Sequence, residues 1–150
     1  MVATIRDILQ EKGSAVWHVG PKATAYEALE VMAEKNVGAL PVIDGETLIG
    51  IFSERDYARK VILKGKSSRE TLVKELMTRE VYTVAPDDSI NDCMALMSLA
   101  HARHIPVLES GRLVGIVSIG DIVKVIIREQ HVKIKDLETY ISGGYFGSKS

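Results

Sequence analysis

Polar and apolar positions along the chain follow first the period of an α-helix and then that of β-strands. From Thr24, which can form a capping box with Glu27, apolar residues recur at three- and four-residue spacing up to Met32. LPVID, a polar turn and TLIGIF follow, a pattern that predicts a short β-hairpin. A second helix is expected after Ser53, which stands at its N-cap position. With a short strand expected at VWHV (16–19), the elements read β-α-β-β-α.

The same order of elements occurs a second time. Residues 16–62 align without a gap on residues 81–127, so that GIFSERD at 50–56 falls on GIVSIGD at 115–121 and VWHV falls on VYTV. Ahead of the aligned region, IRDILQ echoes VKELMT. One unit is too small to bury two helices and a sheet alone, so the two copies are expected to pack face to face across a pseudo-twofold axis. The sequence thus predicts a single α/β domain.

We divide the expected module, residues 1–150, into a first unit at 4–67, a second unit at 68–130, and a C-terminal helix with a flexible tail at 131–150. The helix DIVKVIIRE in the second unit is apolar on more than one side. One small core cannot cover all of these side chains, so a second protein surface is expected against this helix.

Composition narrows the classes of function. The chain has 150 residues, 46% of them hydrophobic, and its net charge of -1 gives no general reason to bind nucleic acid or an anionic membrane. No run approaches the roughly 18 apolar residues of a membrane helix, and the N-terminus lacks a signal-peptide pattern, so a cytoplasmic protein is expected. The single cysteine, Cys93, excludes an intramolecular disulfide and suits a buried helical position.

Sequence motifs for catalysis or metal binding are weak. His101 and His104 form an HxxH pair, but no third ligand is evident, so we expect no metal site. The chain has no GxSxG, HExxH or phosphate-binding Gly-Lys-Ser loop. Nucleotide hydrolysis with Asp56 as the base would lack a metal site and a second carboxylate. We therefore assign no catalytic residues.

The two copies of Gly-apolar-x-Ser-x-x-Asp, each preceded by a Leu/Ile-Pro-Val hairpin, resemble a tandem pair of cystathionine-β-synthase-type (CBS) domains, or Bateman module. The resemblance extends over residues 4–128. It implies a non-catalytic regulatory module that needs no cofactor, binds AMP, ADP or ATP, in some members NAD or S-adenosylmethionine, and signals energy state to a partner protein. It also implies a homodimer in which four units form a flat disc. The sequence does not identify the effector protein.

A serine and an aspartate three residues apart at a strand-to-helix turn suit a nucleotide. The start of the helix offers backbone N–H groups and the serine hydroxyl to a phosphate, and the carboxylate of Asp56 or Asp121 can accept hydrogen bonds from both ribose hydroxyls. Helix capping alone explains a single Ser-x-x-Asp equally well. The duplication favours ligand binding, and one of the two copies could still serve only as a cap.

In the family that this chain resembles, the aspartate of one unit works with the residues just before Pro-Val in the other unit. Arg103 and His104 would then face Asp56, whereas Gly38 and Ala39 would face Asp121, so the Asp56 cleft is expected to take the phosphorylated ligand. The expected main site comprises Ser53, Arg55, Asp56, Met77, Thr78, Arg103, His104, Ile105 and Pro106. The expected second and weaker site comprises Ala39, Leu40, Pro41, Ser118 and Asp121.

Other features leave alternatives open. The basic stretch from Arg55 to Arg69 could contact nucleic acid, but it has one aromatic residue and no counterpart in the second unit; we expect Arg55 to serve phosphate and the other cations to stay in water. Trp17 and Tyr82 fall at matching places on the expected first strands, which predicts a shared packing role. The alternative function is a constitutive dimerisation or scaffold protein with little or no ligand binding.

Overall fold

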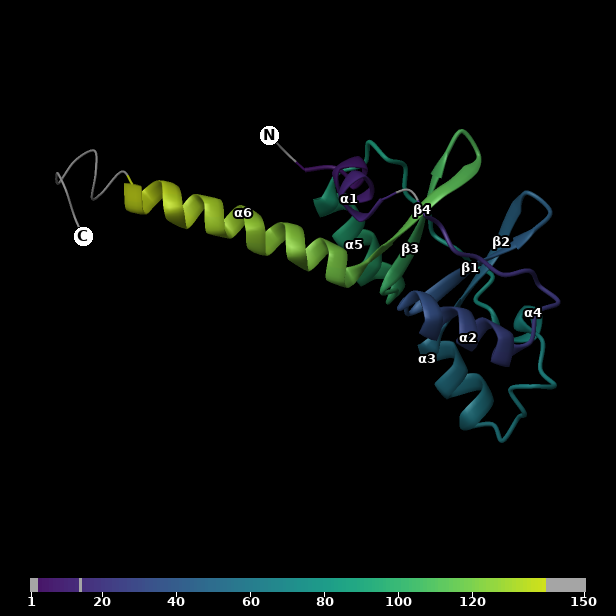
Figure 1. Cartoon of the computed structure of the whole chain (residues 1–150). Helices are drawn as coiled ribbons and strands as arrows, with labels where there is room; N and C mark the ends of the chain where they lie inside the picture. Colours follow the sequence, from purple (N-terminus) through teal and green to yellow (C-terminus); the bar gives the residue numbers. More distant parts are fainter. Residues whose placement is uncertain (1–2, 14, 140–150) are drawn as a thin grey trace.

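The chain is described by a computed structural model, which covers residues 3–13 and 15–139 (Figure 1). The predicted tail beyond residue 139 lies outside the described residues. The elements in chain order are α1 (Ile5–Lys12), α2 (Ala25–Lys35), β1 (Ala39–Asp44), β2 (Thr47–Ser53), α3 (Glu54–Tyr57), the π-helical η1 (Ala58–Ile62), α4 (Val73–Leu76), α5 (Ile90–Ala100), β3 (His104–Glu109), β4 (Arg112–Ser118) and α6 (Ile119–Thr139).

Two antiparallel hairpins, β1-β2 and β3-β4, form two separate sheets with matching registers. Pro41 faces Ile51 in the first hairpin, and Pro106 faces Ile116 in the second. Each hairpin has an irregularity directly after the Pro-Val pair and a turn glycine with positive φ. The repeat found in the sequence is therefore also a repeat in three dimensions, and the predicted α/β architecture of two related units is confirmed.

The expected first strands at 16–19 and 81–84 are each reduced to a single parallel bridge, Val19 with Val42 and Val84 with Val107. Val19 N–H donates to the carbonyl of Pro41, and Val19 carbonyl accepts from Ile43 N–H. The next bond of a parallel ladder would need an N–H at position 41, which proline lacks. Proline in the Leu/Ile-Pro-Val pattern thus limits the ladder in both units.

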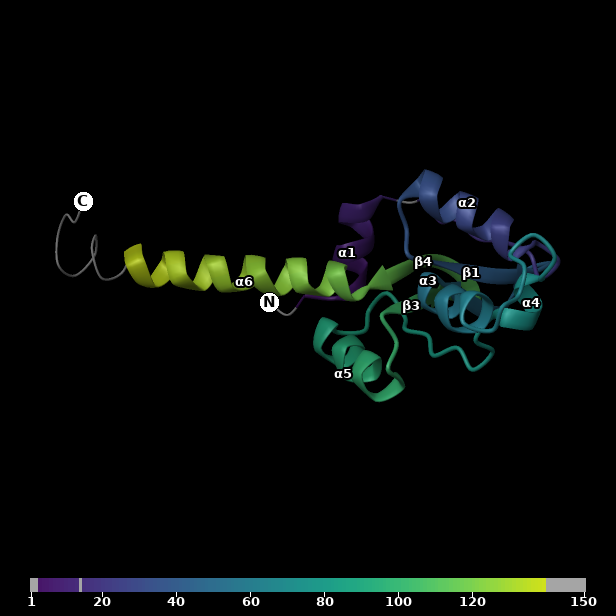
Figure 2. The ribbon, with the colours of Figure 1, turned by 90° about the horizontal axis from the view of Figure 1, so that it is seen from below.

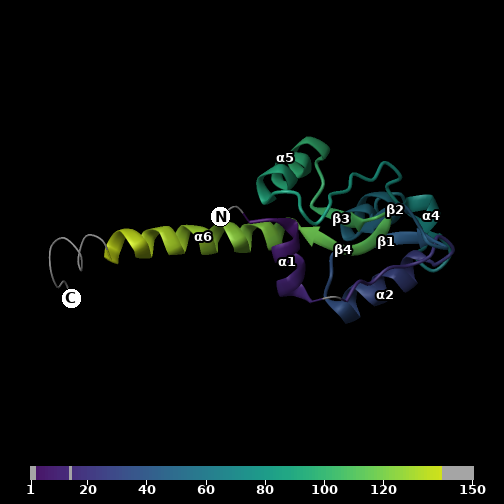
Figure 3. The same ribbon diagram turned by 90° about the horizontal axis from the view of Figure 1, so that it is seen from above.

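The two core clusters exchange their short helices. Val73 and Leu76 of α4 pack with β1, β2 and α2, whereas Ile5 and Ile8 of α1 pack with β3, β4 and α5. The expected boundary between residues 67 and 68 therefore divides the sequence, but the cores do not follow it strictly. The core around β1 and β2 contains α4, and the core around β3 and β4 contains α1. Figures 2 and 3 show both hairpins between α2 on one side and α5 on the other. This exchange ties the two units into one body.

Cys93 lies at a fully buried position of α5, as predicted. Burial, together with the nearby charge of Asp88, raises the pKa of its thiol to about 11. The thiol therefore stays protonated at neutral pH and acts as a small apolar side chain.

Helix α6 runs without a break from Ile119 to Thr139 and projects away from the two hairpins (Figure 1). Its first turns contact β4, α5 and α1, and Ile122 is fully buried there. Its large apolar side chains that stay exposed fall at one helix face, and they are Ile119, Val123, Ile127, Ile134 and Leu137. We name these five residues the α6 stripe.

Candidate nucleotide-binding cleft

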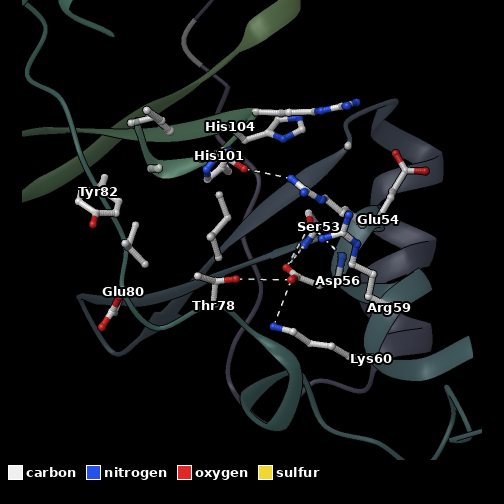
Figure 4. A pocket seen from close by; sticks show the side chains of 18 residues that line it. Ser53, Glu54, Asp56, Arg59, Lys60, Thr78, Glu80, Tyr82, His101 and His104 are labelled. Atoms are coloured by element: carbon white, nitrogen blue, oxygen red, sulfur yellow. Dashed lines mark hydrogen bonds and ion pairs between the residues drawn. The ribbon is translucent and has the colours of Figure 1, made fainter. Parts of the chain in front are cut away.

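A cavity of about 460 Å³ lies between the two units (Figure 4). The first unit contributes β2, α3 and η1, and the second contributes the segments before α5 and β3 as well as the end of α5. Asp56 and Arg103 both line this cavity. The carboxylate of one unit and a cation of the other thus share one hollow, which the nucleotide interpretation requires.

The two carboxylate oxygens of Asp56 have different hydrogen-bonding partners. Oδ2 accepts hydrogen bonds from the backbone N–H and the hydroxyl of Ser53, both at 3.0 Å, and Ser53 Oγ in turn accepts from Asp56 N–H at 3.1 Å. This is a capping box that fixes the start of α3. Oδ1 points to the cleft, where Thr78 Oγ1 donates at 3.4 Å and Lys60 Nζ lies at 3.2 Å. The capping and ligand-binding interpretations of Ser-x-x-Asp are therefore compatible, because each uses a different oxygen.

Basic side chains from both units line the same cavity as this carboxylate. Arg55, Arg59 and Lys60 come from α3 and η1, Arg103 lies just before β3, and His104 is the first residue of β3. Burial lowers the pKa of His104, and the charges of Lys12 and Arg103 lower it further, while Asp121 opposes them. His104 is therefore neutral at pH 7 and can gain a proton when an anion enters.

The cavity brings together most residues of the expected main site. Those that line it are Ser53, Arg55, Asp56, Thr78, Arg103, His104 and Ile105. Met77 and Pro106 are buried and are not among the lining residues. Met77 packs under the hairpin instead, since a Cβ added to Gly50 would lie 2.5 Å from its Sδ. It belongs to the core cluster of the first unit.

Gly38 was expected opposite Asp121, but it lines the Asp56 cavity. Its carbonyl accepts from Glu54 N–H at 3.0 Å, and a Cβ added to it would lie 3.2 Å from His104 Nε2. The residues that precede the two Pro-Val pairs therefore meet near the pseudo-twofold axis. A residue there contacts both clefts, so sequence position alone does not assign it to one.

The sequence interpretation missed several lining residues. Arg59 and Lys60 were expected to stay in water, yet both line the cavity, and Lys60 also donates to the carbonyl of Leu76 at 2.8 Å. Tyr82 lines the cavity, whereas its counterpart Trp17 lies under the ammonium of Lys35, so the two aromatic residues do not share a role. The signal that could have found Lys60 is its spacing, one helical turn after Asp56.

The second motif is built differently around Asp121. Asp121 Oδ2 accepts from Ser118 N–H and from the ammonium of Lys12, both at 2.9 Å. Burial raises the pKa of Asp121, but the hydrogen bonds and charge of Lys12 and the bonds from Ser118 outweigh it, so the net shift is downward. A cavity of about 140 Å³ between α1 and α6 includes Lys12 and Asp121 in its lining, but no residue between 13 and 120 lines it, so it is not the counterpart of the Asp56 cavity. The other expected residues of the second site, Ala39, Leu40 and Pro41, are buried in β1.

Residues 5–63 and 73–128 match the protein family described as CBS domain. The chain belongs to the CBS domain family. The CBS domain-containing protein CBSX3, mitochondrial, from Arabidopsis thaliana is 39% identical over 152 aligned positions, covering 95% of this chain and 73% of that protein. The predicted tandem CBS pair is thereby confirmed.

Solved CBS structures have the same fold. The crystal structure of the CBS domain NE2398 has 44% sequence identity and a TM-score of 0.80, covering 85% of this chain and 99% of that one. The CBS domain pair of protein MJ0100, in complex with 5′-methylthioadenosine and S-adenosyl-L-methionine, has 26% identity and a TM-score of 0.77, covering 86% of this chain and 99% of that one. A CBS pair of this fold thus binds adenosine compounds in at least one relative.

Over residues 3–13 and 15–139, no group of three or more His, Cys, Asp or Glu side chains is arranged to hold a metal ion. Within the same residues, no helix combines the length and the apolar character that crossing a membrane needs.

Proposed function

We propose that this CBS pair is a regulatory module that binds one adenosine nucleotide in the Asp56 cleft without turning it over. The observation that carries the proposal is the single cavity in which Asp56 is joined by cations from both units. Its volume of about 460 Å³ falls within the roughly 300–1,000 Å³ of small-molecule sites. The adenosine compounds bound to the MJ0100 pair support the same ligand class.

Each part of a nucleotide has matching residues in the cleft. Asp56 Oδ1 is suited to accept from the ribose hydroxyls, since its bond from Thr78 is long at 3.4 Å and can be exchanged for a shorter one. Ile51, Ile105 and Tyr82 offer apolar surface to the adenine. The phosphates would lie among Arg55, Arg59, Arg103 and His104.

Charge distinguishes among the candidate ligands. AMP, ADP, ATP and NAD carry phosphate groups that the cations of the cleft can neutralise, whereas the sulfonium of S-adenosylmethionine would be repelled. The cleft therefore favours a phosphorylated adenosine compound. Since the cavity lies between the units, the ligand can change how they are held together, and an effector protein would read that change. A cytoplasmic location stays a prediction, and the Arabidopsis relative is named as mitochondrial.

The exposed α6 stripe favours a homodimer as the functional form. Val123, Ile127, Ile134 and Leu137 keep the three- and four-residue alternation of a coiled-coil seam, with Gln130 between them. Such a seam on a projecting helix is unfavourable in water and would be covered by a second copy of α6. The same observation supports the alternative function of a constitutive dimerisation protein, which would dimerise without responding to nucleotides.

Thermal melting distinguishes the two functions. AMP, ADP, ATP, NAD and S-adenosylmethionine are added separately at millimolar concentration to the wild type and to Asp56→Ala. A ligand that binds only the folded state must raise Tm, so at least one phosphorylated compound is expected to stabilise the wild type and not the variant. A Tm indifferent to all five compounds would leave the dimerisation function.

A further inference from the structure

Lys12, the last residue of α1, reaches into the second motif. Its ammonium donates to Asp121 Oδ2 at 2.9 Å and to the carbonyl of Ile116 at 2.8 Å. Asp121 keeps 14% of its side-chain surface exposed. The carboxylate expected to bind a ribose in the second cleft is therefore already paired with a cation of the same chain.

In the first unit, Thr78 contacts the equivalent strand carbonyl and the aspartate, but it uses the carboxylate oxygen that does not cap the helix. Its backbone N–H donates to the carbonyl of Ile51, the counterpart of Ile116, at 2.9 Å, and its hydroxyl donates to Asp56 Oδ1 at 3.4 Å. A hydroxyl both donates and accepts, so it can share Asp56 with a ribose hydroxyl. An ammonium only donates, and its charge-assisted bond at 2.9 Å is the stronger one.

Helix length explains the difference between the units. Helix α4 ends at Leu76, and Met77 is extended with ψ 152°, so that Thr78 pairs with Ile51 of β2. Helix α1 continues through Lys12 and ends at Gly13 with φ 94°. The position that matches Thr78 in the repeat is Gln10, which is exposed within the longer helix. The longer helix thus places Lys12, two residues after Gln10, next to Ile116 of β4.

Lys60 does not have the same effect in the first cleft. It approaches Asp56 at 3.2 Å from one turn further along the same helical segment. It donates to the carbonyl of Leu76 in α4 at 2.8 Å and lines the cavity of about 460 Å³ beside Asp56. A lysine next to the aspartate is therefore compatible with an open cleft, and the bridge from Lys12 to the β4 carbonyl is the distinguishing feature.

We propose that Lys12 is a specificity-determining residue that closes the Asp121 cleft to ribose, so that the module takes one nucleotide per chain. This inference rests on the proposed function of the Asp56 cleft. A nucleoside whose hydroxyls take Asp121 Oδ2 would have to displace the ammonium from that oxygen and from the carbonyl of Ile116.

Isothermal titration with adenosine and with AMP tests the inference on full-length variants. The wild type is expected to bind one AMP per chain. Asp56→Ala is expected to bind neither compound, and Asp56→Ala combined with Lys12→Ala is expected to gain one adenosine per chain. Adding Asp121→Ala to that pair should remove this binding. Lys12→Arg keeps a cation at the same place and should leave the second cleft closed.

Several results distinguish a failure of this inference from a failure of the proposed function. If the wild type binds nothing and Lys12→Ala still opens an Asp121-dependent site, the Asp56 proposal fails and the Lys12 inference stands. Two ligands per wild-type chain would overturn the inference. The inference would also be overturned if the double variant Asp56→Ala, Lys12→Ala kept the wild-type Tm and bound no adenosine. Lys12→Gln replaces Lys12→Ala if the latter does not fold, and Lys66→Ala controls for the loss of an exposed lysine.

Discussion

The guanidinium of Arg55 donates a hydrogen bond to the backbone carbonyl of His101, 3.0 Å away, and so joins the two CBS units across the Asp56 cleft. Arg55 belongs to α3 of the first unit, while His101 caps the C-terminus of α5 in the second with φ 53°. The left-handed backbone of His101 ends the helix and leaves its carbonyl available to this cation. The contact lies at the cleft that the ligand is proposed to fill.

Replacing Arg55 with alanine should weaken AMP binding. The change removes one cation of the phosphate region and the bond to His101. A charge-assisted hydrogen bond contributes roughly 1.5 kcal/mol or more, which corresponds to about a tenfold loss of affinity. Isothermal titration measures the effect. Arg69→Ala is the control, because Arg69 stacks on Tyr26 outside the cleft, and an equal loss in both variants would refute a specific role of Arg55.

AMP affinity should rise as the pH falls from about 7.5 to 6. Burial and the charges of Lys12 and Arg103 depress the pKa of His104 in the free module, despite the opposing charge of Asp121. A phosphate beside the ring would raise that pKa, so the complex would hold more proton than the free module, and acid would favour the complex. His104→Gln should have a flatter pH profile. The nucleotide's own titration is common to both proteins, so identical profiles would show that His104 does not respond to the ligand.

Gly50→Ala should destabilise the fold more than Gly115→Ala, although the two glycines are equivalent in the repeat. A Cβ at Gly50 would lie 2.5 Å from Met77 Sδ and 3.0 Å from the carbonyl oxygen of Thr78, which is backbone and cannot move away cheaply. At Gly115 the near neighbour is the terminal methyl of Leu9. Overpacking costs about 1–3 kcal/mol, and we expect the Gly50 variant at the upper end in urea unfolding. Equal losses would contradict the asymmetry between α1 and α4.

Disrupting the α6 stripe should convert the proposed homodimer to monomer. Ile134 and Leu137 are 54% and 61% exposed, and glutamate at either position would place a charge in the proposed seam. Sedimentation equilibrium of Ile134→Glu and Leu137→Glu should give the mass of one chain, whereas Lys135→Gln, on another face of α6, should keep the mass of two. Unchanged dimers in both glutamate variants would show that α6 does not form the interface.

The repeat and the local chemistry of each hairpin could be predicted from the sequence, because helix caps, turn residues and strand periods are local signals. The length of the strands expected at 16–19 and 81–84 could not be predicted. It depends on which strand Pro41 faces and on which hydrogen bond is lost because proline has no N–H. The exchange of α1 and α4 between the cores also depends on tertiary packing, and their similar sequences do not reveal it.

Most of the residues expected at the main site line one cavity, because the pseudo-twofold axis determines which segments meet. The second cleft was predicted from the same symmetry, and the symmetry fails there. Lys12 lies outside the gapless alignment, in the segment where the first copy has its longer spacer. Its contact with Asp121 follows from α1 being 8 residues long where α4 has 4, a difference that comparison of the motifs alone does not show.

A crystal structure of the module grown with AMP would test the central claim most directly. We expect the ribose hydroxyls within hydrogen-bonding distance of Asp56 Oδ1, the phosphate among Arg55, Arg103 and His104, and Lys12 still bonded to Asp121. A nucleotide seated on Asp121, or AMP bound outside the space between the two CBS units, would contradict the account.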